Sequence, residues 1–592
     1  MVTNNNNTHS LLDITKAAIQ MLPRMPNFLR GVWQLSRPKK TDFGSTAGLL
    51  QQQAMRNPHA LFLHYHQQRY SYGEFNTWCN RLARRLQAEG IKKGDCVAVM
   101  MGNCPQLLAC VFAINKLGAV AGMMNPKQRG AVLEHSFGII QPKLLIYTAD
   151  CQEALDSCTL NAAITAFEYP QLHVQSTDLD DSNLAVTDSI QLGDICYYVF
   201  TSGTTGMPKS AALTHLRWVK AGIAFGSMSM ALKPSDVQYC AMPLYHNTAL
   251  SVSLSTAIRS GSSVVLADKF SASSFWDDIR RYQCTCFIYV GEICRFLLNQ
   301  PEQATDRDHK VRVILGNGLR AEIWDAFQQR FGIKRICELY GASEGNVGFV
   351  NAFNLKRTVG FSPMKYAIVQ FDIEREQPLV NPQGHMQRVN KGDIGLLITA
   401  VTDKAPFDGY TNNPNANSAK LMHNVFAHGD CWFNTGDLVR DQGYRHIGFI
   451  DRVGDTFRWK AENVATTEVE AQIQTFADVV EAVVYGVEVP NTDGRAGMAS
   501  LILAHGRRFN PSAFYQHLKR QLPDYAVPLF VRLGQQHEVT GTFKIMKSEL
   551  KKQGFRLRHE QEKIYVLIDR TLGYQPLDAD LLQQIESGSV RF

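Results

Sequence analysis

One segment constrains this chain more than any other: an apolar, strand-like run at Cys196–Phe200 leads directly into the polar loop Thr201–Lys209, TSGTTGMPK. Glycine lets a backbone approach a phosphate closely, and successive N–H groups with Ser and Thr hydroxyls form an anion cradle. Lys209 adds a positive charge. The spacing Gly203-x-x-Gly206-x-x-Lys209 differs from the loop of P-loop nucleotide hydrolases. The segment therefore predicts a phosphate-binding loop at the end of a strand.

An ordinary polar turn is the alternative interpretation of this loop, because Ser, Thr and Gly are common in turns. We favour phosphate binding because nine consecutive residues of this kind are rare in a plain turn. Further nucleotide-binding motifs later in the chain would support that choice.

Short apolar runs alternate with helical stretches along most of the chain. This alternation predicts an α/β protein with largely parallel sheets. With 592 residues, of which 45% are hydrophobic, the chain is long enough for a large core and for several fused folding units. The expected strands are Cys96–Met101, Leu144–Tyr147, Cys196–Phe200, Ser263–Leu266, Phe287–Val290 and Val313–Leu315, and Gln106–Leu117 is an expected helix.

The sequence changes character near residues 435–460, where Gly, Asp and Arg become frequent. We expect two short β segments with turns here, followed by a helix that starts at Thr466–Glu470. Ala482–Tyr485 and Ala499–Leu503 are expected strands of a smaller α+β unit. We therefore predict a domain boundary at Asp451–Asp455, with a large lobe over residues 46–453 and a small mobile domain over residues 454–592.

Residues 1–45 form a third, basic segment. Up to Lys40 the only acidic residue is Asp13, against six Lys and Arg residues interspersed with apolar side chains such as Trp33. Two interpretations stand: a surface helix packed on the main body, and peripheral contact of residues 1–40 with a membrane surface. Pro23 and Pro26 exclude one long uninterrupted helix.

Charge and cysteine content exclude several classes of protein. The excess of 61 Lys and Arg over 54 Asp and Glu is small and dispersed, so we expect no nucleic-acid partner. The 13 cysteines are scattered without any C-x-x-C pair, which argues against disulfides and zinc and favours a reducing cytoplasm. The start lacks a basic run followed by an apolar run, so we expect no secretory signal. We therefore predict a cytoplasmic protein, with the inner face of a membrane as the site of any peripheral contact.

Four further blocks follow the loop in a fixed order, and together they resemble the adenylate-forming enzyme superfamily. These blocks are Tyr340–Glu344 (YGASE), Thr435–Asp437 (TGD), Asp451–Arg452 and Gly541–Lys544 (GTFK). A narrower similarity joins Gly316–Ile333 and Glu338–Asn346 to the very-long-chain acyl-CoA synthetase and fatty-acid transport protein branch. It extends over about Tyr70 to Phe555. The resemblance implies an α/β fold with a large N-terminal lobe of fused α/β subdomains and a small mobile α+β C-terminal domain.

The resemblance also implies a role for individual residues. Glu344 would bind Mg²⁺, Asp437 would accept hydrogen bonds from the ribose hydroxyls, and Arg452 would support that site. Lys544 would stabilise charge as the mixed anhydride forms, and His246 would lie near the acyl carboxylate. The residues that would hold the phosphates are Thr201, Ser202, Gly203, Thr204, Thr205, Gly206 and Lys209, and those around the adenine are Gly316, Asn317, Gly318, Tyr340, Gly341 and Ser343.

Each single assignment has a structural alternative. Asp437 lies in a turn-like sequence where Asp often bonds its own backbone. Arg452 could equally form a surface ion pair, and His246 alone would be read as a satisfied core histidine. Their shared order along the chain favours the functional roles.

The implied reaction couples a fatty acid of long or very long chain to coenzyme A, using ATP and Mg²⁺, through an acyl-adenylate. A carboxylate is a poor acyl donor, and AMP supplies a leaving group that a thiol can displace. Two departures are notable: Ala461 replaces a glycine common in relatives at the pantetheine tunnel, and Gly454 takes the usual Asp or Lys place in the hinge.

Four other functions remain open. The acid could be another bulky carboxylate resembling a bile acid, or the acceptor could be a carrier protein. A membrane-associated uptake protein for fatty acids is the third alternative. The fourth is a serine hydrolase, because Gly341–Gly345 fits the G-x-S-x-G elbow motif.

Overall fold

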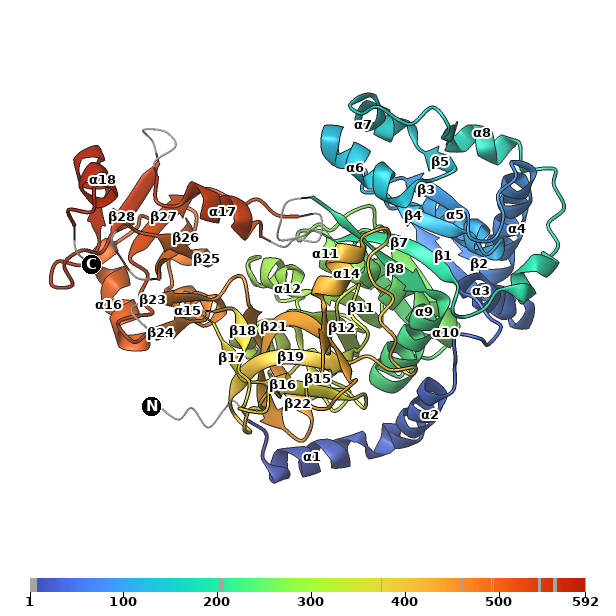
Figure 1. Cartoon of the computed structure of the whole chain (residues 1–592). Coiled ribbons are helices and arrows are strands. Elements are labelled where there is room, and N and C mark those ends of the chain that lie inside the picture. Colours follow the sequence, from blue (N-terminus) through green and yellow to red (C-terminus); the bar gives the residue numbers. More distant parts are fainter. Residues whose placement is uncertain are drawn as a thin grey trace.

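The computed structural model describes residues 8–201, 207–373, 375–459, 462–490, 492, 494–540, 545–556, 562–590 and 592. Figure 1 shows a large body and, on its left, a smaller C-terminal lobe in red, with two N-terminal helices along the lower edge of the body. Ser202, Gly203, Thr204, Thr205, Gly206, Ala461 and Lys544, all discussed above, lie outside the described residues.

The first sheet of the body carries the strand that leads into the glycine-rich loop. Its strand order is β6-β5-β3-β4-β7-β8, parallel throughout except for the antiparallel pair β7–β8. The loop joins this antiparallel pair, so Thr201 and Lys209 lie opposite each other where β7 ends and β8 begins. The strands are β3 (Cys96–Met100), β4 (Val120–Met123), β5 (Leu144–Tyr147), β6 (Thr165–Glu168), β7 (Ile195–Thr201) and β8 (Lys209–Thr214).

The second sheet of the body changes from parallel to antiparallel at β13. Its order is β2-β1-β10-β9-β11-β12-β13-β14-β15-β22-β21-β19-β16, with β20 beside β21. The parallel part comprises β1 (Leu61–Tyr65), β9 (Val237–Cys240), β10 (Ser263–Leu266), β11 (Cys286–Val290), β12 (Val313–Asn317) and β13 (Ile336–Tyr340), with β2 (Gln68–Ser71) antiparallel at its edge. The antiparallel part comprises β14 (Phe349–Val350), β15 (Gly360–Phe361), β16 (Tyr366–Val369), β19 (Ile394–Ala400), β20 (Leu421–His423), β21 (Cys431–Gly443) and β22 (His446–Arg452).

The helices of the body follow local sequence signals. Ser71 and Glu74 form a capping box at the start of α4, each side chain accepting a hydrogen bond from the other residue's N–H. These helices are α3 (Thr46–Arg56), α4 (Tyr72–Ala88), α5 (Pro105–Lys116), α6 (Gly130–Ile140), α7 (Gln152–Asp156), α8 (Tyr169–Val174), α9 (His215–Ala221), α10 (Leu254–Ser260), α11 (Phe275–Arg281), α12 (Gly291–Leu298), α13 (Ala321–Phe331) and α14 (Pro414–Ala419). Shorter helical segments are η3 (Ala149–Cys151), η4 (Ala185–Ser189), η5 (Gly222–Met230) and η6 (Thr248–Ser253), and β17 (Phe371–Asp372) pairs with β18 (Gln377–Pro378).

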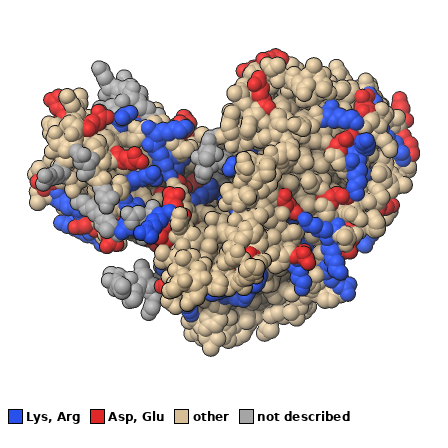
Figure 2. Space-filling view, viewed as in Figure 1, with Lys and Arg blue, Asp and Glu red and all other residues tan. Residues whose placement is uncertain are grey.

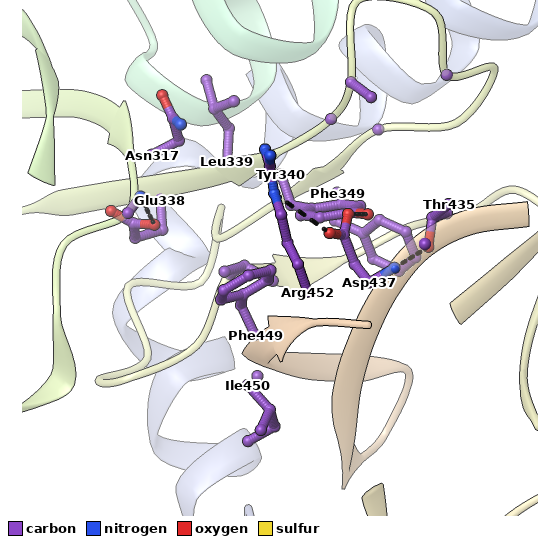
Figure 3. Close-up of a pocket in the computed structure, with 18 of the residues that line it drawn as sticks. Asn317, Glu338, Leu339, Tyr340, Phe349, Thr435, Asp437, Phe449, Ile450 and Arg452 are labelled. Carbon is purple, nitrogen blue, oxygen red and sulfur yellow. Dashed lines mark hydrogen bonds and ion pairs between the residues drawn. The ribbon is translucent and has the colours of Figure 1, made fainter. Parts of the chain in front are cut away.

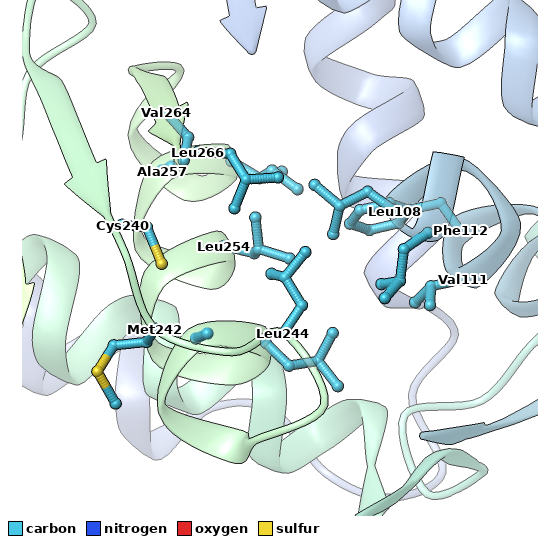
Figure 4. Packing of buried hydrophobic residues seen from close by; sticks show 14 of the residues in the cluster. Leu108, Val111, Phe112, Cys240, Met242, Leu244, Leu254, Ala257, Val264 and Leu266 are labelled. Atoms are coloured by element: carbon cyan, nitrogen blue, oxygen red, sulfur yellow. The ribbon is translucent and has the colours of Figure 1, made fainter. Parts of the chain in front are cut away.

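The main hydrophobic core lies between the two sheets of the body. Helix α5 has buried residues almost throughout, as its continuous apolar run predicts. Figure 4 shows Leu108 and Phe112 of α5 facing Leu254 of α10 and Leu266 of β10 across this core. At roughly 1.5–3 kcal/mol for each buried aliphatic or aromatic side chain, this cluster is a major source of stability for the body.

The C-terminal lobe has its own sheet and its own core. The strand order is β25-β26-β27-β28-β29, and a buried cluster around Phe457, Tyr485, Phe514 and Phe530 packs on it. The strands are β23 (Phe457–Trp459), β24 (Glu462–Val464), β25 (Val479–Glu488), β26 (Arg495–Leu503), β27 (Phe530–Gly534), β28 (Lys563–Val566) and β29 (Gln575–Pro576), and the helices are α15 (Thr466–Gln474), α16 (Pro511–Gln521), α17 (Lys547–Gln553) and α18 (Ala579–Glu586).

The N-terminal helices form an arm over the surface of the body. Helices α1 (Leu11–Met21) and α2 (Met25–Ser36) are separated by η2 (Leu22–Arg24). This break lies at the two prolines, as expected. Met21 and Gly31 are buried against the body, so the arm does pack on the main body.

The observed fold confirms the predicted α/β class with a separate C-terminal lobe. The expected strands Leu144–Tyr147 and Ser263–Leu266 have the same bounds in the structure, and the other expected strands of the body differ by one or two residues at their ends. In the C-terminal lobe the expected strands are too short, because β25 extends three residues further at each end and β26 begins four residues earlier. One expectation is wrong: the segment near residue 435 belongs to a long strand, β21, and not to a short β segment that begins after a turn. The domain bounds at residues 45 and 453 remain predictions.

Candidate active site

A cleft of about 3630 Å³ lies between the C-terminal lobe and the body. Residues from both parts line it, and its walls include the ends of β7, β12, β13 and β22 together with Met546 and Lys547 from the C-terminal lobe. Figure 2 shows the notch at the upper edge of the molecule, with Lys and Arg side chains on the flank of the C-terminal lobe. A cleft with such a basic wall suits an anionic ligand.

One wall of the cleft forms where β12 and β13 end side by side. These strands are parallel, and Gly316 lies opposite Glu338, so Gly318 and Tyr340 emerge at the same edge of the sheet. A Cβ on Gly316 would lie 2.2 Å from the carbonyl oxygen of Tyr289, and Gly318 has φ +81°. Both positions therefore require glycine, and because glycine has no side chain, the backbone itself forms a flat surface on this wall.

Glu338 holds the end of this wall in place. Its fully buried carboxylate accepts hydrogen bonds from the hydroxyl of Tyr289 at 2.7 Å, from N–H of Leu319 at 2.9 Å and from N–H of Gly318 at 3.0 Å. Burial raises the pKa of Glu338 to about 8, while these three donors act in the opposite direction. Glu338 therefore fixes the Gly318–Leu319 loop from behind the cleft.

Three predicted residues meet where β13, β21 and β22 border the cleft. The hydroxyl of Tyr340 donates a hydrogen bond to Oδ2 of Asp437, and Nε of Arg452 lies 3.9 Å from Oδ1 of the same carboxylate. Figure 3 shows Asp437 between Tyr340 and Arg452, with Thr435 beside it. Asp437 and Arg452 are opposite residues of the antiparallel pair β21–β22, so strand register brings them together. The N–H of Asp437 donates to Oγ1 of Thr435 at 3.1 Å, which orients the carboxylate.

Glu344 and Lys209 are connected through a residue that the sequence did not single out, Tyr410. The hydroxyl of Tyr410 donates to Oε1 of Glu344 at 2.8 Å. The ammonium of Lys209 lies 5.5 Å from the centroid of the Tyr410 ring, within cation–π range. Tyr410 lies 66 residues after Glu344, and no spacing pattern in one sequence marks it.

Lys420 is a second site residue that sequence reasoning missed. Its ammonium donates to the carbonyl oxygen of Thr435 at 3.3 Å and lies beside Gly436. Burial lowers the pKa of Lys420, the carboxylates of Glu344 and Asp437 raise it, and the cations Lys209 and Arg452 lower it. These electrostatic interactions place Lys420 among the four predicted charged residues.

The donor set of the site can be compared with what a magnesium ion needs. Within the residues that the structure describes, no group of three or more His, Cys, Asp and Glu side chains is arranged to hold a metal. Glu344 is a single carboxylate in the cleft. This fits Mg²⁺, which commonly binds through one or two carboxylates together with phosphate oxygens of the substrate, and does not require a cage of protein ligands.

Other predicted residues line the same cleft. His246 is half-buried in the connection between β9 and η6, with its ring 4.5 Å from that of Tyr245. Gly341 and Ser343 follow Tyr340 along the cleft wall, and Asn317 and Thr201 line it at strand ends. Ser202–Gly206 and Lys544 lie outside the described residues, so their roles remain predictions from the sequence.

The serine-hydrolase interpretation of Gly341–Gly345 is wrong. A nucleophile elbow requires a strand, a sharp turn and then a helix. Here β13 is followed by a turn in which N–H of Gly345 donates to the carbonyl oxygen of Ala342, and then by strand β14.

Ion pairs join the C-terminal lobe to the body beside the cleft. Arg320 of the body lies 3.5 Å from Glu292 of the body and 3.4 Å from Glu470 of the C-terminal lobe. Arg295 lies 2.6 Å from the same Glu292 and 3.1 Å from Glu481 of the C-terminal lobe. Arg295 and Arg320 therefore both bind Glu292 within the body, and each also binds a second glutamate in the C-terminal lobe.

On the C-terminal side, Glu470 also binds the start of α17. The ammonium of Lys547 lies 2.9 Å from Glu470 and donates to Oγ1 of Thr466 at 2.8 Å. Lys551 of the same helix donates to the carbonyl oxygen of Gly454 and to Asp455, both at 2.7 Å. These contacts tie α17 to the predicted hinge segment.

Comparison with protein families assigns most of the chain. The AMP-binding enzyme model matches residues 50–386, and the AMP-binding enzyme C-terminal domain model matches residues 468–544.

Among curated proteins, the chain is 44% identical over 586 residues to the medium/long-chain-fatty-acid–CoA ligase FadD6 of Mycobacterium tuberculosis, with 98% of each chain covered. It is 37% identical to long-chain fatty acid transport protein 2 of Rattus norvegicus, covering 90% of this chain and 89% of that protein.

Among solved structures, ATP-bound MatB of Rhodopseudomonas palustris has a TM-score of 0.73 at 20% identity, covering 86% of this chain and 98% of that chain. The o-succinylbenzoate coenzyme A synthetase MenE of Bacillus subtilis in complex with AMP has a TM-score of 0.70 at 21% identity, with the same coverage. Both share the fold.

Proposed function

The chain belongs to the AMP-binding enzyme family, and we propose that it is an ATP-dependent ligase that joins long-chain fatty acids to coenzyme A. The observation that carries this proposal is the convergence of Tyr340, Asp437 and Arg452 with Glu344 and Lys209 in one cleft. These residue types suit a nucleoside triphosphate: an aromatic ring for the base, a carboxylate for the ribose, and cations for the phosphates.

The first half-reaction joins the fatty-acid carboxylate to the α-phosphate of ATP and releases pyrophosphate. Asp437, oriented by Thr435 and Tyr340, would accept hydrogen bonds from the ribose hydroxyls. The flat wall at Gly316–Gly318, supported by Glu338, leaves room for the adenine ring. Lys209 and Lys420 bring positive charge to the same cleft, where it stabilises negative charge that develops during transfer.

Mg²⁺ would be held by Glu344 together with the phosphates and would neutralise part of their charge. The hydrogen bond from Tyr410 orients the Glu344 carboxylate for this role. In the second half-reaction the thiol of coenzyme A attacks the acyl carbonyl carbon, the bond to AMP breaks, and AMP leaves with the electron pair.

The identity of the acid is supported by the relatives. The names of the two relatives concern fatty acids of medium or long chain, and the chain aligns with them over most of its length. The apolar part of the cleft, with Phe225, Met228 and Val252 from η5 and η6, offers a surface for an alkyl chain.

The proposal is tested with purified protein, ATP, Mg²⁺, coenzyme A and a panel of fatty acids that includes a bile acid. We expect pyrophosphate release and acyl-CoA formation, measured by a coupled assay and by mass spectrometry, with the fastest rates for long chains. Formation of neither pyrophosphate nor acyl-AMP with any acid would show the proposal to be wrong. Formation of acyl-AMP without acyl-CoA would show that transfer of the acyl group to the thiol fails, and Ala461 would then be the first residue to test.

Fatty-acid uptake is a second candidate, favoured by the name of the transport protein that shares 37% identity with the chain. Uptake that follows from thioester formation requires the active site. A Glu344→Gln variant should therefore lose uptake and ligase activity together. Uptake that survives in this variant would establish a transport activity separate from catalysis.

A further inference from the structure

The helices of the N-terminal arm each have two opposite apolar faces. On α1, successive residues turn by about 100°, which places Leu12 and Ile19 on the side opposite Ala17 and Met21, with Leu11 at the edge of that side. Ala17 and Met21 are buried, whereas Leu11 is 66% exposed and Ile19 is 59% exposed. A surface helix of a globular protein ordinarily has one apolar face, toward the core. The outer side of α1 therefore carries exposed apolar side chains next to the exposed polar residues Thr15 and Lys16.

Helix α2 repeats this pattern. Leu29 and Trp33 lie on its outer side and are 58% and 53% exposed, while Gly31 on its inner side is buried. A Cβ on Gly31 would lie 2.1 Å from Cγ of Met228, so α2 is in close contact with η5. The outer apolar row of the arm consists of Leu11, Leu12, Ile19, Leu22, Leu29 and Trp33.

The arm is held firmly against the body, so its outer row is presented in a defined orientation. At one end, N–H of His9 donates to the carbonyl oxygen of Gln442 and Lys391 donates to that of His9. In the middle, the Phe28 ring contacts Phe353, with centroids 5.7 Å apart. At the other end, Lys40 forms an ion pair with Asp408 at 2.8 Å.

Positive charge flanks the outer row. Lys16 and Arg30 are exposed on the two helices and Arg37 is exposed directly after α2, and none of them has an ion-pair partner among the residues that the structure describes. The guanidinium of Arg37 lies 3.8 Å from the centroid of the exposed Trp33 ring. In Figure 2 the lower edge of the molecule, along which α1 and α2 run, is mainly tan with blue side chains at its right-hand end.

A cluster of arginines lies beside α2. Arg259 of α10 donates to Oε1 of Gln34 at 3.0 Å. Burial lowers the pKa of Arg259, and the nearby positive charges of Arg30 and Arg56 lower it further. Three cations close together attract an anionic surface and repel a second copy of the same patch.

We propose that the outer row of α1 and α2 docks on the surface of a lipid bilayer that contains anionic headgroups. The two helices lie in the plane of the interface, with their apolar side chains at the level of the acyl boundary and the flanking cations among the phosphates. Amphipathic helices with Lys or Arg beside Trp and Leu bind membranes in this way. No described helix has the length and apolar composition to cross a bilayer, so the contact is peripheral to it.

The docked arm would also lie next to the apolar part of the cleft. Val32 and Leu35 of α2 line the cleft, as do Phe225 and Met228 of η5, against which α2 packs. A fatty acid in the bilayer would therefore reach the cleft along α2 without crossing bulk water. This step rests on the proposed function, whereas docking itself does not.

Docking is tested by sedimentation of the purified full chain with vesicles of phosphatidylcholine alone or with about one third phosphatidylglycerol. We expect binding to the anionic vesicles and a blue shift of Trp33 fluorescence that brominated lipids quench. Ile19→Gln and Leu29→Gln should each weaken partitioning about tenfold, because a partly exposed aliphatic side chain gains about that much on burial. Arg30→Gln and Arg37→Gln should each weaken it about fivefold, an effect that high salt removes.

Matched controls come from exposed positions far from the arm. Leu572 is 65% exposed and Arg508 is also exposed, so Leu572→Gln and Arg508→Gln remove the same groups elsewhere. Gln is a good helix former and all substituted side chains face water, so thermal unfolding should stay unchanged in every variant. Equal losses in the control variants would overturn the proposal.

Two other outcomes would also overturn it. The first is wild-type protein that stays in the supernatant with anionic vesicles and shows no fluorescence shift. The second is a dimer in light scattering that Leu29→Gln dissociates, without vesicle binding, which would identify a second copy as the occupant. Delivery is tested by comparing acyl-CoA formation from acid in vesicles with that from a short, water-soluble acid. The arm variants should lose acyl-CoA formation from acid in vesicles and retain it with the water-soluble acid. Loss of activity with both acids would indicate damage to the active site.

Discussion

Replacing Asp437 by Asn tests the nucleotide site most directly. The side chain is 14% exposed, its Oδ2 accepts a hydrogen bond from Tyr340, and its Oδ1 lies 3.9 Å from Nε of Arg452. The amide of Asn keeps the shape of the side chain but loses the charge and one acceptor. Thr435 and Arg452 are unchanged in this variant, so a loss of AMP affinity reports on the carboxylate of Asp437.

The expected magnitude follows from the hydrogen bonds at stake. A hydrogen bond to a charged group contributes about 1.5–3 kcal/mol. Loss of one such bond from a ribose hydroxyl, together with the unfavourable contact between the Asn amide and the Tyr340 hydroxyl, should weaken AMP binding by about 2–4 kcal/mol, which corresponds to roughly 30- to 1000-fold. Binding of pyrophosphate, which has no ribose, should be unaffected.

Titration calorimetry with AMP and with pyrophosphate measures both quantities on the same protein. Asp441→Asn is a matched control, because Asp441 lies on the same strand and its Oδ1 accepts from N–H of Gly443, a bond that an amide oxygen retains. AMP affinity of Asp437→Asn within threefold of wild type would refute the ribose assignment. An equal loss of AMP and pyrophosphate binding would mean that the substitution disturbs the whole cleft.

Three further predictions concern charge in and around the cleft. Because the folded-state pKa of Glu338, about 8, exceeds its ordinary 4.5, the folded protein keeps a proton that the unfolded chain loses, and the free energy of unfolding should fall by about 1.4 kcal/mol per pH unit between these values. Glu338→Gln should remove this slope in urea melts from pH 5 to 8, and an unchanged slope would contradict it. Lys420→Met should lower pyrophosphate release about a hundredfold, whereas Lys356→Met at an exposed ion pair should leave it unchanged; similar rates in both would exclude a role for Lys420. Arg320→Gln should increase trypsin cleavage near residue 453 several-fold, because one ion pair that restrains the C-terminal lobe is lost, and an unchanged cleavage rate would count against that restraint.

Six strands of the parallel sheets were predicted from the sequence, because they are largely buried; these are β3, β5, β7, β10, β11 and β12. The strands β1, β4, β6, β9 and β13 of the same sheets were not predicted. Runs such as Leu144–Tyr147 and Ser263–Leu266 are uninterrupted and apolar, which distinguishes them from the flanking helices and turns. The long strand β21 was not predicted. Its Thr-Gly-Asp segment reads as a turn, and Gly436 does have φ +76°, yet the strand continues past it with β19 and β22 on its two sides.

The site was predictable where residues follow a motif and not where they approach from elsewhere. Tyr340, Asp437 and Arg452 were expected to act together, and strand register places them in contact. Tyr410 and Lys420 belong to the segment between β19 and β21 and reach the cleft only because that segment folds back over β8. No periodicity or spacing encodes such a tertiary contact.

Ion pairs cross the interface between the two lobes beside the cleft, and this has a consequence for turnover. Glu292 belongs to the body, as do Arg295 and Arg320, so its ion pairs with both arginines do not depend on the position of the C-terminal lobe. The two arginines therefore retain a counter-charge when the lobes separate. Separation then exchanges the glutamates of the C-terminal lobe for water and ions as partners of these arginines. The rate at which the C-terminal lobe reorients should accordingly rise with ionic strength, because salt screens these ion pairs. A catalytic cycle limited by this motion would run faster at moderate salt than at low salt.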